Sequence, residues 1–172
     1  MGSKRAINLL RKGLRPRMTN VGAGLQPVET LSSAGTYAAP TKTCTEDDSG
    51  KTFFIDCSTV NICLQVPSTA VAGWTCRIVM ATASDNEATK DFALTTGSDS
   101  VDFGGHIRQG GDSVIEITSA TSCIAFDTSD GAVTVGDWLE VTCDGTDYYV
   151  VGTTVNAATI DIGDAADAHT LA

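Results

Sequence analysis

The sequence predicts an all-β fold: an antiparallel β-sandwich of jelly-roll-like type, or a barrel, behind an extended basic N-terminal arm. From Tyr37 onward, about ten short runs with alternating apolar and polar residues follow one another at roughly ten-residue spacing. Clusters rich in Gly, Pro, Asn, Asp and Ser separate these runs. Helical periodicity is weak and confined to residues 4–14. We therefore expect an arm and linker over residues 1–36, a sandwich domain over 37–163 and a tail over 164–172.

The arm is cationic and the body is acidic. Six of the eleven basic residues lie in the first 17 positions, whereas residues 18–172 carry five basic and 21 acidic residues, a net charge of −16. Pro16 ends any helix that the weak period begins. Such an arm is suited to touch another surface rather than to fold the body, although a solvated tail is the simplest alternative.

Three partners suit a basic arm: an acidic protein lattice, nucleic acid and a membrane. The arm lacks the bulky aromatic residues that membrane docking needs. The acidic body repels nucleic acid, which argues against it as the main partner. An acidic protein surface is therefore favoured. The residues expected to contact it are Arg5, Ile7, Leu10, Arg11, Lys12, Leu14, Arg15 and Arg17.

The strands follow in order along the body. Pro67 ends the second run, Ser58-Thr59 predicts a hairpin between the first two runs, and Asp144-Gly145 predicts a type I′ hairpin late in the chain. The predicted strands are 52–57, 60–66, 74–82, 92–95, 101–103, 113–119, 122–127, 138–143, 148–155 and 159–162.

Strand parity predicts the environment of three of the six cysteines. Cys57, Cys76 and Cys143 each share a strand face with large apolar residues, so we expect them to be buried as small apolar side chains. Cys63 and Cys123 fall on the opposite parity, and parity gives them no explanation. Six cysteines can pair in 15 ways, but free thiols, kept reduced in a cytoplasm, are the expected state.

No motif predicts catalysis, a cofactor or a metal. Residues 49–52 (SGKT) resemble the end of a phosphate-binding loop, but Thr45 stands where that loop needs Gly, and a strand follows in place of a helix. His106 and His169 lack a nucleophile elbow, and the acidic clusters lack calcium-loop spacing. We therefore expect a protein that is not an enzyme.

Oligomerisation is expected from the strand at residues 148–155. Tyr148 and Val150 alternate with Tyr149 and Val151, so this strand carries apolar groups on both faces. Such a strand is either sandwiched or at an interface. The residues expected at an oligomer interface are Trp138, Tyr148 and Tyr149.

The order of several turn-and-strand motifs carries a family resemblance. These motifs are residues 47–56 (DDSGKTFFID), 62–67 (ICLQVP), 72–74 (AGW), 135–141 (VGDWLEV) and 144–152 (DGTDYYVVG). Over residues 41–155 the chain resembles the trimeric β-sandwich modules of tailed-bacteriophage virions, of the capsid decoration or head-fibre type.

The resemblance implies a structural protein made in the host bacterial cytoplasm and placed on the capsid exterior. The implied partners are the major capsid protein lattice, which the protein decorates or cements, and two further copies in a homotrimer. The alternative is a receptor- or glycan-binding module of a tail appendage.

Overall fold

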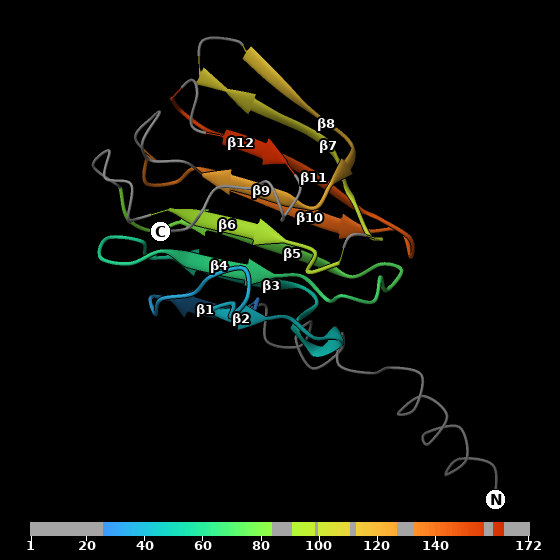
Figure 1. Ribbon diagram of the computed structural model, residues 1–172. Helices are drawn as coiled ribbons and strands as arrows, with labels where there is room; N and C mark the ends of the chain where they lie inside the picture. The colour runs from blue at the N-terminus through green and yellow to red at the C-terminus, as the bar shows by residue number, and fades with distance from the viewer. Residues whose placement is uncertain are drawn as a thin grey trace, which may run out of the picture.

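Two β-sheets pack face to face in the computed structural model (Figure 1). The structure describes residues 26–83, 91–98, 100–110, 113–126, 133–156 and 160–163. The seven-stranded sheet has the order β1-β3-β5-β10-β11-β7-β8, and the five-stranded sheet the order β12-β9-β6-β4-β2. The elements are β1 (Val28–Leu31), β2 (Lys42–Thr43), the 3-10 turn η1 (Glu46–Asp48), β3 (Lys51–Ile55), β4 (Ile62–Gln65), β5 (Thr75–Met80), β6 (Phe92–Thr95), β7 (Phe103–Gln109), β8 (Ser113–Thr121), β9 (Cys123–Phe126), β10 (Trp138–Cys143), β11 (Tyr148–Thr153) and β12 (Ile160–Gly163).

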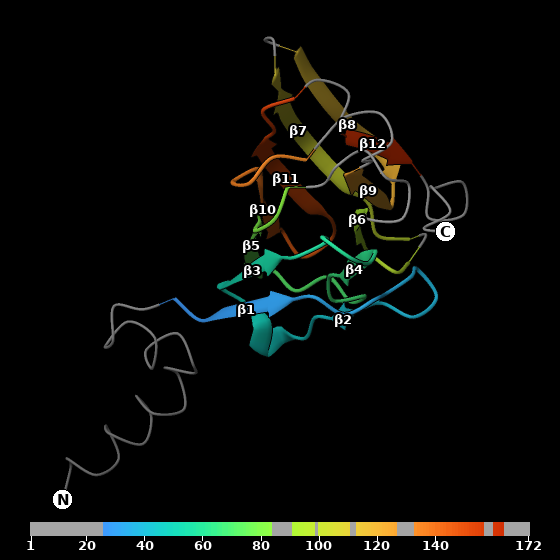
Figure 2. The same ribbon diagram turned by 90° about the vertical axis from the view of Figure 1, so that its left-hand side faces the viewer.

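The first half of the chain winds back and forth between the sheets. Strands β1, β3 and β5 lie in the seven-stranded sheet, and β2, β4 and β6 lie in the five-stranded sheet. Each crossing returns the chain in the same direction, so β1, β3 and β5 run parallel, as do β2, β4 and β6. Figure 2 shows the sheets on opposite sides of the core, with β7 and β8 at the top beside β12.

The all-β sandwich is confirmed, but its strand directions differ from the expected antiparallel pattern. Half of the strand pairings are parallel, so both sheets are mixed. The hairpin expected at Ser58-Thr59 is wrong, because β3 and β4 belong to different sheets. The hairpin at Asp144-Gly145 is confirmed: β10 and β11 pair antiparallel, with Cys143 opposite Tyr148. Its loop spans residues 144–147 in place of a two-residue turn.

The segment expected to be a linker contributes a strand. Residues 28–31 form β1, which pairs with β3 at the edge of the seven-stranded sheet, with Val28 beside Thr52. The sheet therefore starts before residue 37. The residues that follow pass to the five-stranded sheet, where the Thr41 hydroxyl accepts the Cys63 N–H at 3.1 Å. The expected arm contacts, at residues 5–17, and the tail at residues 164–172 lie outside the described residues.

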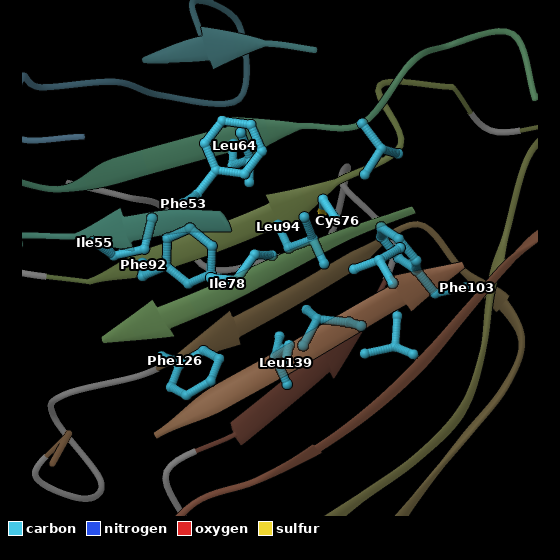
Figure 3. Close-up of a cluster of buried hydrophobic side chains, with 14 of the residues drawn as sticks. Phe53, Ile55, Leu64, Cys76, Ile78, Phe92, Leu94, Phe103, Phe126 and Leu139 are labelled. Carbon is cyan, nitrogen blue, oxygen red and sulfur yellow. The ribbon is translucent and has the colours of Figure 1, made fainter. Parts of the chain in front are cut away.

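One apolar core fills the space between the sheets (Figure 3). Alternate residues of each strand point inward, so Phe53 and Ile55 from β3 meet Phe92 and Leu94 from β6. Each fully buried side chain of this size contributes about 1.5–3 kcal/mol to folding. The parity prediction is confirmed for Cys57, Cys76 and Cys143, which all belong to this core.

The two largest fully buried side chains, Trp74 and Tyr148, contact each other in the core. The ring of Trp74 meets the ring of Tyr148 edge-on, with centroids 5.8 Å apart. The indole N–H of Trp74 donates to the Thr45 carbonyl at 3.0 Å, so its one polar group is satisfied. In the part of the chain that the structure describes, no helix is long and apolar enough to cross a membrane.

Candidate interaction face

The seven-stranded sheet turns one face away from the core, and we call it the outer face. Strand register sets its outward side chains in transverse rows. The first row is Val28, Thr52, Arg77, Glu140, Val151, His106 and Glu116. The second row is Thr30, Phe54, Val79, Trp138, Thr153, Arg108 and Val114. The third row holds Thr75, Thr142, Tyr149 and Gly104.

The first row carries opposite charges on neighbouring strands. Arg77 on β5 lies directly beside Glu140 on β10, and His106 on β7 lies beside Glu116 on β8. All four side chains are exposed. The opposite charges of Arg77 and Glu140 favour the observed register of β5 and β10 by a few tenths to about 1 kcal/mol.

The second row is apolar over three adjacent strands. Phe54, Val79 and Trp138 come from β3, β5 and β10 and are each partly exposed. The guanidinium carbon of Arg77 lies 5.0 Å from the ring centroid of Trp138, a cation–π distance. Together with Val28, which is 65% exposed, and Val151, which is 40% exposed, these residues give the outer face a large apolar content.

The third row has the bulky side chain of Tyr149 at one end and a surface depression beside Gly50 at the other. Tyr149 is 49% exposed, and its ring lies over Gly104. Gly50 donates its N–H to the Thr75 carbonyl, which places it at the opposite end of this row. Gly50 has φ +83°, and open space lies where a side chain would start. A depression of about 170 Å³ results, lined by Gln26, Gly50, Lys51, Thr75, Cys76, Arg77 and Glu140.

The first and second rows of the outer face are together electrically balanced, although the body is acidic. Two arginines, Arg77 and Arg108, match two glutamates, Glu116 and Glu140. The described residues as a whole contain thirteen acidic and four basic side chains. Two acidic side chains of the loop before β11, Asp144 and Asp147, lie close to Tyr149 and place negative charge at the end of the third row.

The corresponding face of the five-stranded sheet is covered. Cys63, Ala93 and Cys123 point away from the main core and are nevertheless buried, with Tyr37 packed against them. The Tyr37 hydroxyl oxygen lies 2.7 Å from the Cys123 sulfur. This second cluster explains the two cysteines of opposite parity. All six cysteines are free and buried, and burial, with a smaller effect from Cys123, raises the pKa of Cys63 to about 12.

A compact ion-pair cluster joins the two sheets where β1 and β2 meet η1. Lys51 contacts Asp48 at 2.6 Å and Glu29 at 3.0 Å, and Lys42 contacts the same carboxylates at 3.3 and 3.7 Å. Burial alone would raise the pKa of Asp48, but hydrogen bonds from Lys51, the Thr45 N–H and Lys42 outweigh it and lower the pKa to about 2. The cluster therefore links β1, β2 and β3 to η1, and its two lysines are already paired with carboxylates.

The structure separates the three residues that the sequence places at an oligomer interface. Trp138 and Tyr149 lie on the outer face. Tyr148 does not, because its side chain is fully buried in the core and its pKa is raised by that burial. Sequence reasoning missed Arg77, Glu140 and Gly50. The alternation of side chains along a strand identifies which residues point outward. Which of them become neighbours across the sheet depends on the register between segments that are distant in the sequence.

The described residues contain no group of three or more His, Cys, Asp or Glu side chains placed to hold a metal ion. His106 sits exposed in the first row beside Glu116, and His169 lies outside the described residues. Neither a protein-family model nor a curated protein matches the chain. The resemblance to phage structural proteins therefore rests on the sequence motifs.

Proposed function

We propose that this chain is a non-enzymatic structural protein of a tailed-bacteriophage virion, which decorates or cements the capsid exterior through its N-terminal arm. The observation that carries the proposal is the separation of charge along the chain. The arm holds six basic residues before position 18, and the rest of the chain has a net charge of −16. An arm of this sign suits an acidic lattice of capsid protein.

The body adds support, because two of the four basic side chains that the structure describes in it are already paired with carboxylates. Lys42 and Lys51 are held in the ion-pair cluster with Glu29 and Asp48. Arg77 and Arg108 lie in the balanced first and second rows of the outer face. Attachment of an acidic body to an acidic lattice then falls to the arm, whose arginines can pair carboxylates bidentately.

Charge alone does not suffice for attachment. Exposed ion pairs contribute only about 0–1 kcal/mol each, and ordering the arm costs roughly 1–2 kcal/mol per residue. Apolar contacts from Ile7, Leu10 and Leu14 must offset that cost. Avidity from several copies on one lattice adds to the affinity.

The test compares three full-length or truncated proteins for binding to particles that lack the endogenous protein. One variant lacks residues 1–17, the second changes Ile7, Leu10 and Leu14 to Ser, and the third changes Arg11 and Arg15 to Lys as a matched control of equal charge. We expect the first two to fold normally and lose binding, and the third to retain most of it. Full occupancy by the first two would show that the arm is not the attachment device.

A further inference from the structure

We infer that the outer face is the surface through which two copies of this chain pack against each other. The two-fold axis runs along the strands, midway between β5 and β10. This inference concerns the body alone and does not rest on the proposed role in the virion. It also differs from the homotrimer that the family resemblance implies, so a mass measurement separates the two.

The position of the axis fixes which strands meet. A two-fold axis lying in the plane between two stacked sheets sets each strand opposite the strand at equal distance on the other side. Strand β5 of one copy then faces β10 of the other, β3 faces β11, and β1 faces β7. Stacked sheets lie about 10 Å apart with strands within about 30° of each other, which keeps these neighbours in reach.

The charges on the first row match under this axis. Arg77 lies on one side of it and Glu140 directly across on the other, so Arg77 of each copy meets Glu140 of the other. Two ion pairs form at the centre of the contact. Of the ion pairs that the structure gives between described residues, none includes Arg77 or Glu140. The Arg77 guanidinium stacks on Trp138, a contact that does not neutralise its charge, so that charge can still pair with Glu140 of a second copy.

Side-chain sizes match as well. On the second row, Trp138 of one copy faces the smaller Val79 of the other, and Phe54 faces Thr153. On the third row, Tyr149 faces the hollow at Gly50. That depression measures about 170 Å³, and a cavity of roughly 150 Å³ accepts a benzene ring. Each of these pairs sets a large group against a small one.

The balance of charge favours a second copy over other occupants. Two bodies of strong negative charge repel each other least where they meet over neutral surface, and the first and second rows of the outer face together are such a surface. The six overlapping strands lie about 4.8 Å apart, and the three rows cover about 20 Å along the strands. The flat area of the contact is therefore on the order of 600 Å², and the uneven side-chain surface adds to it. Stable interfaces use about 800 Å² on each side, so the face has a suitable size.

Sedimentation equilibrium of the full chain is the first measurement. At tens of micromolar we expect a species of twice the 17.8 kDa chain mass. A monomer at all accessible concentrations, or a trimer, would overturn the inference. Circular dichroism and thermal melting establish that each variant below is folded before its mass is interpreted.

Charge reversal tests the pairing itself. Arg77→Glu alone and Glu140→Arg alone each place like charges across the axis, so each should weaken self-association at least tenfold. An equimolar mixture of the two variants should form a mixed pair, because every reversed charge then meets its opposite. Glu116→Arg, a reversal on the same face at β8, lies outside the overlapping strands and should leave association unchanged.

A variant on the third row tests the contact separately from the Arg77–Glu140 pairs. Tyr149→Glu should abolish the pair, whereas Val135→Glu, at a residue 59% exposed in the turn before β10, should not. The inference fails if the Tyr149 variant dimerises like the wild type, or if folded single-reversal variants show no recovery on mixing.

Discussion

The hydroxyl of Tyr148 donates a hydrogen bond of 2.7 Å to the carbonyl oxygen of Pro67, across the core of the sandwich. Tyr148 begins β11 of the seven-stranded sheet, and Pro67 follows β4 of the five-stranded sheet. The tyrosine ring also packs on Trp74 and Phe103. The sequence of β11 has apolar residues on both faces. On the inner face, the reason is that Tyr148 packs in the core and its hydroxyl links the two sheets.

Replacing Tyr148 with Phe should destabilise the fold while keeping its packing. The change leaves the buried Pro67 carbonyl without this donor, which costs about 1–3 kcal/mol. Urea unfolding of Tyr148→Phe at low protein concentration measures the loss. The control is Tyr149→Phe, where the exposed hydroxyl lies outside the core; equal losses for the two variants would contradict this account.

The Asp48 cluster should make stability depend on pH. The pKa of the Asp48 carboxyl in the folded protein is about 2, below the ordinary value of 3.8. The cluster's contribution is then complete above about pH 4 and is lost as the pH falls through the folded pKa. The free energy of unfolding should drop between about pH 4 and pH 2, and Asp48→Asn should remove that part of the slope.

Asp48→Asn should also lower stability near neutral pH by about 2 kcal/mol, since it removes charge-assisted hydrogen bonds from Lys51 and Lys42. The matched control is Asp47→Asn, an exposed carboxyl in the same 3-10 turn. If the two variants show the same pH profile as the wild type, the cluster is not the source of the dependence.

All six thiols should be inert in the folded protein. Burial, assisted by the charge of Asp48, raises the pKa of Cys44 to about 12, and burial raises those of Cys57, Cys63 and Cys76. Because the thiolate is the reactive form, an aromatic disulfide reagent should label none of them rapidly at about pH 8. In denaturant it should label all six; fewer labelled thiols would show oxidised cysteines.

Tyr37 should protect the outer cysteine cluster. Tyr37→Ala uncovers Cys63, Ala93 and Cys123, so we expect those two thiols to react first and stability to fall by about 3 kcal/mol. Tyr37→Phe keeps the ring over the cluster and removes only the hydroxyl beside Cys123. Equal labelling rates for the Ala variant and the wild type would show that Tyr37 is not the cover.

Local patterns predicted much of the fold. Alternation located strands and assigned Cys57, Cys76 and Cys143 to the core, since side-chain direction depends only on the strand itself. Sheet membership was not predictable in this way. The two residues Ser58-Thr59 have hairpin length, yet the chain there crosses to the other sheet, because the apolar faces of β3 and β4 bury against each other from opposite sides.

Only part of the candidate site could be found from the sequence. Trp138 and Tyr149 stand out as aromatic residues on strands, whereas the roles of Arg77, Glu140 and Gly50 depend on which strands become neighbours. The parallel pairing of β3 with β5 joins segments more than twenty residues apart, and no local signal sets that register. Tyr148 was misplaced for the same reason, since its burial depends on Trp74 and Pro67.

The central claim, that this chain decorates a phage capsid, is tested most directly by counting its copies in purified virions of a phage whose genome carries its gene. Quantitative densitometry against the major capsid protein should give on the order of hundreds of copies per particle for a capsid decoration protein that repeats with the lattice. A few to dozens of copies would contradict capsid decoration and favour a receptor- or glycan-binding module of a tail appendage. Absence from the particle would contradict a virion role altogether.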